Sequence, residues 1–239
     1  KYRKAFAEWQ PAVQHITYGD LDDLRHTINH DTAAIVVEAI QGEGGVHPAT
    51  RSYLQEIRTL CDEYGAMMIV DEIQTGFGRT GDWFAFEHAN IVPDIVTLGK
   101  GIAGGMPMGA VAWRDELGQI PRSSHGSTFG GNPLACAASI ATLTILREER
   151  LAQRAADLGA WFVKELRECE LRQVRDVRGR GLMIGIELRG RVTPVLKALQ
   201  ERSILALPAG LNVLRLLPPL IITQSELERI LAALQEVLD

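Results

Sequence analysis

Through its first hundred residues the chain alternates short apolar segments with amphipathic ones. Candidate strands, each a short run of apolar side chains, occupy residues 15–18, 33–38 and 67–70. Candidate helices, which repeat apolar side chains at helical spacing, occupy residues 20–28 and 52–64. Gly65 supplies a helix stop directly before the third strand. This alternation predicts an α/β fold built on a mainly parallel sheet with helices on both faces.

Ionisable residues stand where three apolar segments end. Glu38 and Asp71 each close a strand, and Lys100 lies at the end of the run 94–101. In such sheets ligands bind beyond the carboxyl ends of the strands. Pyridoxal phosphate chemistry needs an amine and a carboxylate at such an edge, because the amine holds the aldehyde as a Schiff base while the carboxylate keeps the pyridine nitrogen protonated. An isolated aspartate and lysine are more often a helix cap and a solvated loop residue, so the surrounding sequence decides.

Four motifs surround these residues. They read VEAIQGEGG at 37–45, VDEIQTGFGRTG at 70–81, TLGKGIAGGMPMG at 97–109 and HGSTFGGNP at 125–133. In this order the four motifs resemble the class III (omega-amino) aminotransferases, and most of all the group that acts on acetylornithine or on a carrier-bound lysine. The family usually has proline where Ala39 stands, a difference that concerns only the local backbone.

The resemblance implies the fold of type I pyridoxal phosphate enzymes over the whole chain. Residues 1–147 would form the C-terminal part of the large, mainly parallel-sheet cofactor-binding domain, and residues 148–239 a small C-terminal α+β domain. The sequence pattern agrees with a change of architecture there. Helices are predicted at 133–147, 151–169, 193–203 and 224–238, and strands at 110–113, 174–178, 182–188 and 213–217. The helix at 133–147 would join the two domains.

The resemblance also assigns roles to individual residues, with pyridoxal 5'-phosphate as the cofactor. Lys100 and Asp71 are the expected catalytic residues. Cofactor contacts are expected from Asp71, Glu72, Ile73, Gln74, Lys100 and, across a homodimer interface, Thr128. Ser127 would lie by the substrate of the neighbouring subunit, so that the active sites are shared between subunits. A plain turn explains the Ser-Thr-Phe-Gly-Gly segment almost as well from its sequence alone.

Glu43 and Arg215 are predicted to form a substrate switch. The resemblance implies that Glu43 pairs with Arg215 when a donor without a nearby carboxylate is bound, and releases it for 2-oxoglutarate. A guanidinium can serve either carboxylate through a bidentate contact. Arg215 stands in a nearly all-apolar strand, where an unpaired charge would be costly. A purely structural ion pair is the alternative interpretation.

A dinucleotide-binding fold is the rival from another enzyme class. Gly99, Gly101 and Gly104 match G-x-G-x-x-G after a strand, but Pro107 and the adjacent glycines argue against the helix that this motif opens. A P-loop is excluded because Asp94 stands where its first glycine is required.

Composition narrows the partners of the chain. Its 239 residues are 46% hydrophobic and 23% charged, with a net charge of −5, which argues against a broad nucleic-acid-binding surface, and no apolar stretch reaches the length of a membrane span. The three cysteines have no C-x-x-C spacing and indicate a reducing compartment, so a cytoplasmic location is expected. The six histidines show no metal-ligand spacing, and no metal is predicted. The arginines at 172, 175, 178 and 180 could dock an acidic carrier protein, although such runs are usually solvated faces.

The predicted reaction is the transfer of a terminal amino group from N-acetylornithine to 2-oxoglutarate, as in arginine biosynthesis. A carrier-bound or acetylated lysine, as in lysine biosynthesis, ornithine, or another omega-amino donor is the close alternative, and a folding or interaction fragment without activity is the distant one. The sequence begins at Lys1 without an initiator methionine. An N-terminal half is therefore expected to be missing, with the family's phosphate loop, ring-stacking aromatic residue and carboxylate-binding arginine.

Overall fold

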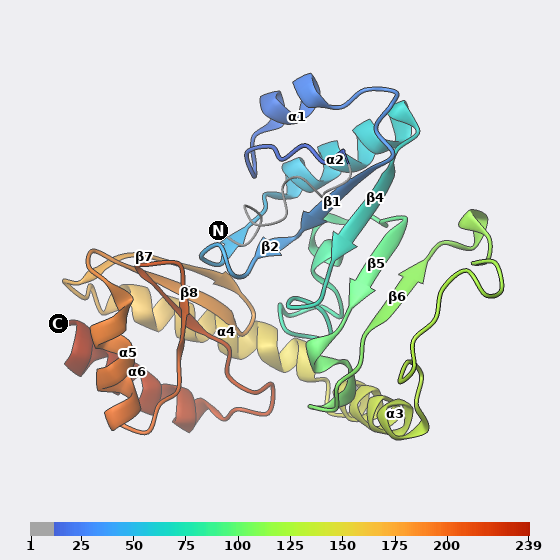
Figure 1. The fold of residues 1–239 in the computed structure, drawn as a ribbon. Coiled ribbons are helices and arrows are strands. Elements are labelled where there is room, and N and C mark those ends of the chain that lie inside the picture. The colour runs from blue at the N-terminus through green and yellow to red at the C-terminus, as the bar shows by residue number, and fades with distance from the viewer. Residues whose placement is uncertain (1–11) are drawn as a thin grey trace.

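A computed structural model describes residues 12–239, which form two separate sheets with helices packed on them (Figure 1). The predicted large domain begins at residue 1, and its first eleven residues lie outside the described part. The first sheet has the order β1-β4-β5-β6. Its strands are β1 (Ala34–Glu38), β4 (Met67–Asp71), β5 (Ile95–Leu98) and β6 (Ala110–Trp113). The β1, β4 and β5 strands are parallel and β6 is antiparallel, so the α/β, mainly parallel architecture is confirmed.

Helix α2 (Arg51–Tyr64) covers one face of this sheet, and α1 (Leu21–Thr27) packs on α2. Helix α1 begins at Asp20, whose side chain accepts from the main-chain N–H of Asp22 and Asp23. Helix α2 begins at Thr50 and ends at Gly65, which takes the left-handed conformation at φ 70°. The apolar stripe of α2 packs against β1 and β4, with Ile57, Cys61, Met68 and Val70 fully buried.

The predicted second layer of helices is not formed by residues 12–239. On the face opposite α2, Val36 is 69% and Val111 54% exposed. The predicted strand at 15–18 was also wrong. Residues 13–17 have no regular structure, and Tyr18 lies in a turn with its hydroxyl donating to Glu38 O at 2.9 Å. The segment 15–18 is a loop whose apolar side chains pack onto the core, and its main chain pairs with no strand of residues 12–239.

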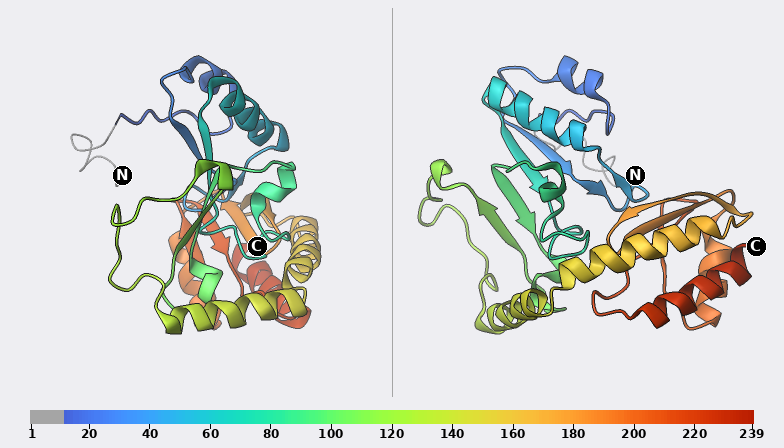
Figure 2. Two further views of the ribbon diagram at one scale, coloured as in Figure 1. Left: turned by 90° about the vertical axis from the view of Figure 1, so that its right-hand side faces the viewer. Right: turned by 180° about the vertical axis from the view of Figure 1, so that it is seen from behind.

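The second sheet is antiparallel and has the order β7-β8-β10-β9. Its strands are β7 (Val174–Arg180), β8 (Met183–Leu188), β9 (Leu207–Ala209) and β10 (Val213–Leu216). Helices α4 (Leu151–Glu168), α5 (Val192–Glu201) and α6 (Gln224–Leu238) pack with it around one apolar core (Figure 2). The sequence did not predict β9, because it is only three residues long and contains Pro208.

Shorter elements connect the two sheets. The hairpin β2 (Ile40–Gln41) and β3 (His47–Pro48) carries the turn 42–46, and helix α3 (Pro133–Glu148) precedes α4 along the chain. The 3-10 helices within residues 12–239 are η2 (Ala85–Ala89), η3 (Lys100–Ala103) and η4 (Asp115–Leu117). The η3 helix ends at Gly104 in the left-handed conformation, so the α-helix that a dinucleotide motif requires does not open at Lys100.

The division of the chain into domains at residues 147 and 148 stays a prediction. Across residues 12–239, no helix combines the length and the apolar character that are needed to cross a membrane.

Candidate active site

The parallel strands bring three polar residues into one row at their carboxyl ends. Glu38 on β1 lies opposite Asp71 on β4, which lies opposite Thr97 on β5. The Asp71 carboxylate accepts two hydrogen bonds on Oδ1, from Ile73 N and from Thr97 Oγ1, each at 3.0 Å. Its Oδ2 accepts none from the described residues. The carboxylate is therefore held in place and keeps one acceptor free for a ligand.

Lys100 follows this row two residues after the end of β5. It is exposed and opens η3 with a left-handed backbone at φ 44°, which residues with a side chain rarely adopt. A β-carbon placed on Gly99 would lie 3.5 Å from Ile73 Cγ2, so the Ile73 side chain borders the approach to Lys100. The structure thus brings Asp71, Ile73 and Lys100 to one sheet edge.

Three further side chains from distant segments meet beside this edge. Arg215 Nη1 donates to Glu43 Oε1 at 2.8 Å and to Gln74 Oε1 at 3.2 Å, and Gln74 Nε2 donates to the same Glu43 Oε1 at 3.0 Å. The hydrogen bond from Arg215, followed by the one from Gln74, lowers the pKa of Glu43 below its usual range against the opposing effect of burial. The contact between Glu43 and Arg215 that the sequence predicted is present.

The two partners of this ion pair differ in exposure. The Glu43 side chain is 74% exposed, whereas that of Arg215 is 6% exposed within β10. Arg215 Nε is buried and has no hydrogen-bond partner among the described residues. An exposed carboxylate can leave easily, but the buried guanidinium needs an acceptor. The geometry suits the exchange of Glu43 for another carboxylate.

Glu38 connects the strand row to the turn that carries Glu43. Its Oε2 accepts from Gly42 N at 3.1 Å. Burial raises the pKa of Glu38 above its usual range, and the nearby Asp71 carboxylate acts in the same direction. The hydrogen bond from Gly42 and the amine of Lys100 oppose this rise. Gly42 lies directly under Gln74, since a β-carbon there would come within 2.3 Å of Gln74 Oε1. Only glycine fits at this position without moving the Gln74 amide.

The Glu72 side chain points into the protein interior rather than to the sheet edge that holds Asp71 and Ile73. It is fully buried, accepts from Phe86 N at 2.9 Å and is hydrogen-bonded by Thr75 Oγ1. Burial raises the pKa of Glu72 against these hydrogen bonds. Its carboxylate anchors the loop before η2, so any cofactor contact of Glu72 would come from its main chain. That contact stays a prediction.

Ser127 and Thr128 do not join the cluster. Both lie exposed in the segment between η4 and α3, and neither side chain is hydrogen-bonded to another residue within 12–239. Their predicted contact across a dimer interface stays a prediction.

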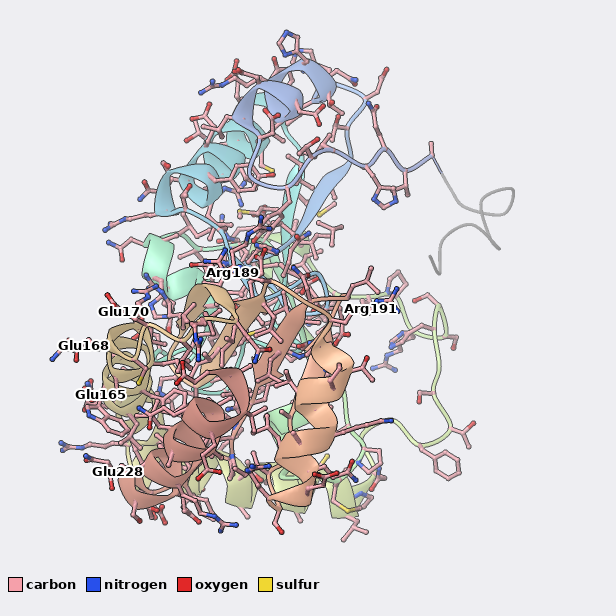
Figure 3. All side chains as sticks on the ribbon, turned by 90° about the vertical axis from the view of Figure 1, so that its left-hand side faces the viewer. Glu165, Glu168, Glu170, Arg189, Arg191 and Glu228 are labelled. Atoms are coloured by element: carbon pink, nitrogen blue, oxygen red, sulfur yellow. The ribbon has the colours of Figure 1, made fainter. Side chains whose placement is uncertain are left out.

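The four arginines of the predicted carrier-docking run are largely paired. Arg178 bonds Asp176 at 2.8 Å and Glu187 at 2.7 Å, Arg175 bonds Glu187 at 3.3 Å, and Arg172 lies 3.4 Å from Asp239. Figure 3 shows labelled acidic residues on the outside of the same domain, at the end of α4 and on α6. They are Glu165, Glu168, Glu170 and Glu228. This part of the surface carries both signs of charge rather than a basic patch.

Sequence reasoning found most of this cluster but missed Thr97 as the residue that fixes Asp71. The sequence offers a partial signal, because Thr97 is a polar residue one position before the end of β5, and the structure places it opposite Asp71. Among residues 12–239, no group of three or more histidine, cysteine, aspartate or glutamate side chains is arranged to hold a metal ion.

Comparison with known proteins adds independent information. The family model described as Aminotransferase class-III matches residues 1–238. The [LysW]-aminoadipate semialdehyde transaminase of Deinococcus radiodurans is 44% identical over 243 residues, covering 100% of this chain and 57% of that protein. The acetylornithine aminotransferase of Methanosarcina mazei is 44% identical over 221 residues, covering 92% of this chain and 56% of that protein. The chain thus spans somewhat more than half the length of these relatives.

A solved structure is similar over nearly the whole chain. It is an ornithine aminotransferase from Toxoplasma gondii with partial occupancy of PLP at its active site, at 37% identity and a TM-score of 0.91. The match covers 96% of this chain and 56% of the Toxoplasma chain.

Proposed function

Because the chain belongs to the class-III aminotransferase family, we propose that it transfers a terminal amino group from an N-acetylornithine-type donor to 2-oxoglutarate. Enzymes of this family depend on pyridoxal 5'-phosphate and have the type I fold of such enzymes. The observation that carries the proposal is the contact of a buried Arg215 with an exposed, exchangeable Glu43 beside Asp71 and Lys100.

The residues at the sheet edge suit this cofactor. Asp71 presents a free Oδ2 to accept the N–H of a pyridinium ring, while Thr97 and Ile73 N hold its other oxygen. Lys100 supplies the amine for attachment, and the Ile73 and Gln74 side chains border the same edge. When bound, pyridoxal 5'-phosphate supplies an electron sink that stabilises negative charge at the reacting carbon.

The protein side chains divide the remaining work. A charged Asp71 keeps a proton on the ring nitrogen, because a carboxylate stabilises a neighbouring cation. The Lys100 amine accepts and returns a proton during the reaction, which requires its neutral form. Arg215 binds the distal carboxylate of the dicarboxylic partner, and Glu43 takes that place when the donor has none.

The names of the relatives support a donor with a terminal amino group, but they do not decide between several such donors. The relatives act, by their names, on acetylornithine, on LysW-linked aminoadipate semialdehyde and on ornithine. Donors that differ by one methylene are separated by only about 1–3 kcal/mol in an apolar pocket. N-acetylornithine is the proposed donor, with a carrier-linked lysine as the second candidate, which the LysW-linked relative supports. A homodimer with shared sites and a cytoplasmic location complete the proposal, the latter supported by three unpaired cysteines.

The rates of the two half-reactions, measured in Arg215→Ala and Glu43→Ala variants of the full-length enzyme, test this proposal. Arg215→Ala should weaken the use of 2-oxoglutarate by about 2–5 kcal/mol, because it removes the partner of a carboxylate. Glu43→Ala should impair the terminal-amine half-reaction more than the glutamate half-reaction, since Arg215 then stands unpaired. Arg202→Ala breaks a surface ion pair with Glu236 and serves as the control.

Single-turnover rates with N-acetylornithine, ornithine and glutamate measure each half-reaction separately. Equal loss of both half-reactions in both variants would contradict the exchange of Glu43 for substrate. A wild-type enzyme that reacted with none of these terminal amines would contradict the donor class.

A further inference from the structure

The second sequence motif ends in Arg79-Thr80-Gly81, and none of the chemistry above uses these residues. The motif begins at the end of β4 with Asp71 and continues through Gln74. Its last part leaves the candidate site and runs onto the second sheet and α4. This segment therefore connects the two residues of the motif that face the site to the part of the chain that carries Arg215.

Arg79 makes the connection with both its side chain and its main chain. Its Nη1 donates to Pro218 O at 2.6 Å and to Leu182 O at 3.2 Å. In the other direction, Leu182 N donates to Arg79 O at 3.0 Å. Pro218 lies three residues after Arg215 on the same segment that leaves β10. Arg79 thus ties the segment after Gln74 to the segment after Arg215.

The guanidinium of Arg79 has no carboxylate partner among residues 12–239, and its acceptors are main-chain carbonyls. Burial lowers the pKa of Arg79 to about 10, which leaves it charged at neutral pH. A buried charge without an ion-pair partner is costly. The neutral glutamine side chain would avoid this cost and has two amide hydrogens, but it is shorter than arginine and would not reach both carbonyls.

The backbones around Arg79 approach too closely to shift. A β-carbon on Gly181 would lie 2.5 Å from Thr80 C and 2.7 Å from Arg79 O, and Gly181 has a left-handed φ of 52°. A β-carbon on Gly81 would lie 3.0 Å from Ala156 Cβ on α4. The segment 78–81 is therefore seated on the second sheet and α4 with no room for a different register.

We propose that Arg79 is a positioning residue that holds Arg215 in reach of Gln74 and Glu43. This inference rests on the proposed function, because its effect is read out as the binding of the substrate carboxylate at Arg215. Gln74 follows the first sheet and Arg215 lies in the second. Their 3.2 Å contact therefore depends on the relative position of the two sheets. Arg79 fixes this relative position by donating to Leu182 O and Pro218 O, which belong to the part of the chain that carries Arg215.

Arg79→Gln and Arg79→Lys in the full-length, cofactor-loaded enzyme test the inference. Glutamine keeps a donor but loses the charge and the reach to two carbonyls, and lysine keeps the charge. The control is Arg167→Gln, because Arg167 also donates to a main-chain carbonyl, Val177 O at 2.6 Å, but joins α4 to β7 within one domain. The dissociation constant of glutarate, an unreactive dicarboxylate, is measured by calorimetry beside the kcat and KM of both half-reactions.

Arg79→Gln should raise the glutarate dissociation constant and the KM for 2-oxoglutarate about tenfold, the size of coupling found between residues of one network. The terminal-amine half-reaction should weaken less than the binding of glutarate, because the 74% exposed Glu43 side chain can follow a displaced Arg215, and Arg79→Lys should recover part of the affinity. In an Arg215→Ala background, Arg79→Gln should cause no further loss, since the residue that it positions is gone. Arg167→Gln should leave glutarate binding unchanged.

Glutarate binding that falls equally in Arg79→Gln and Arg167→Gln would overturn the inference, as would an additive loss in the Arg215→Ala background. If Arg79→Gln does not fold, Arg79→Lys carries the same comparison alone. Wild-type enzyme without transamination contradicts the proposed function, whereas a wild-type enzyme that transaminates with Arg79 variants of unchanged glutarate affinity contradicts only the role of Arg79.

Discussion

Lys100 combines an unusual backbone with its place at the sheet edge. Its φ of 44° is left-handed, and a residue with a side chain pays about 1–3 kcal/mol for such a conformation. Such strain persists where the surrounding structure imposes it and is frequent at functional sites. Gly104 also has a left-handed φ, at the end of the same 3-10 helix, but without a side chain to strain. A lysine where glycine would be easier argues that the amine itself is needed.

Reduction of the cofactor-loaded, full-length protein with borohydride should fix the pyridoxyl group on Lys100. Peptide mapping by mass spectrometry locates the modified lysine. Lys164 provides the internal comparison. It is exposed on α4, far along the chain from Lys100, and is paired with Glu168 one helical turn away. Modification of Lys164 or Lys197 instead of Lys100 would contradict the assignment.

At the scale of elements, the turn after β2 depends on one glycine. Gly42 donates its N–H to Glu38 and leaves room for the Gln74 amide, which in turn contacts both Glu43 and Arg215. Gly44 lies two residues on in the same turn, and a β-carbon there would meet Gln41 Oε1 at an ordinary 3.4 Å. The two glycines therefore differ in what surrounds them.

Gly42→Ala should displace the Gln74 amide from Glu43, and the loss of stability should be about 1 kcal/mol, the lower end of the range for overpacking, because a flexible side chain can move aside. Gly44→Ala should change the free energy of unfolding by less than about 0.5 kcal/mol. Urea denaturation measures stability, and the KM for 2-oxoglutarate reports the displaced Gln74. Equal effects of the two substitutions would show that the Gln74 contact does not limit this turn.

The longer elements could be predicted from sequence because periodicity and end signals agreed. Helix α2 lies one residue from its expected start, and α6 has its expected bounds at Gln224 and Leu238. The errors fall on short elements, where packing decides. The segment 15–18 is a loop held by the Tyr18 hydroxyl, and β9 contains a proline on an edge strand. Neither outcome is encoded in a local pattern of apolar residues.

The site was predictable to the extent that it follows the strand ends and the motifs. Asp71, Lys100 and the contact of Glu43 with Arg215 came from these signals. The bond of Arg79 to Pro218 O joins residues that are 139 positions apart. Side chains that donate to main-chain carbonyls leave no complementary residue type in the sequence, so such contacts require the structure.

At the scale of the whole molecule, residues 12–239 leave one face of the first sheet uncovered, and the chain spans somewhat more than half of its relatives' length. Val36 is exposed on β1, whose other side packs in the core, and Val111 is exposed on the edge strand β6. The chain covers 57% of the Deinococcus relative. An exposed apolar sheet face favours association.

We expect residues 1–239 alone to self-associate and to bind pyridoxal 5'-phosphate much more weakly than the full-length protein. The resemblance to the family implies a phosphate loop and a ring-stacking residue outside these 239 residues, and each lost charge-assisted hydrogen bond costs about 1.5–3 kcal/mol. Light scattering measures association, and absorbance titration measures cofactor affinity. Co-expression with the N-terminal half of a relative is the complementing arm. A monodisperse fragment that binds the cofactor and turns over N-acetylornithine would contradict this expectation.

The ion pair of Glu43 with Arg215 joins residues 172 positions apart. A ribosome that adds about 5–20 residues per second exposes Arg215 roughly 10–30 s after Glu43. Within that interval, once Lys100 has also been made, the nascent chain can assemble the strand row with Asp71 and Lys100, while the carboxylate-binding end has no guanidinium. A message truncated before β10 would thus yield a polypeptide with the amine and without the acceptor pocket. Completion of synthesis, rather than folding of the first sheet, is the event that makes the two ends of the site available together.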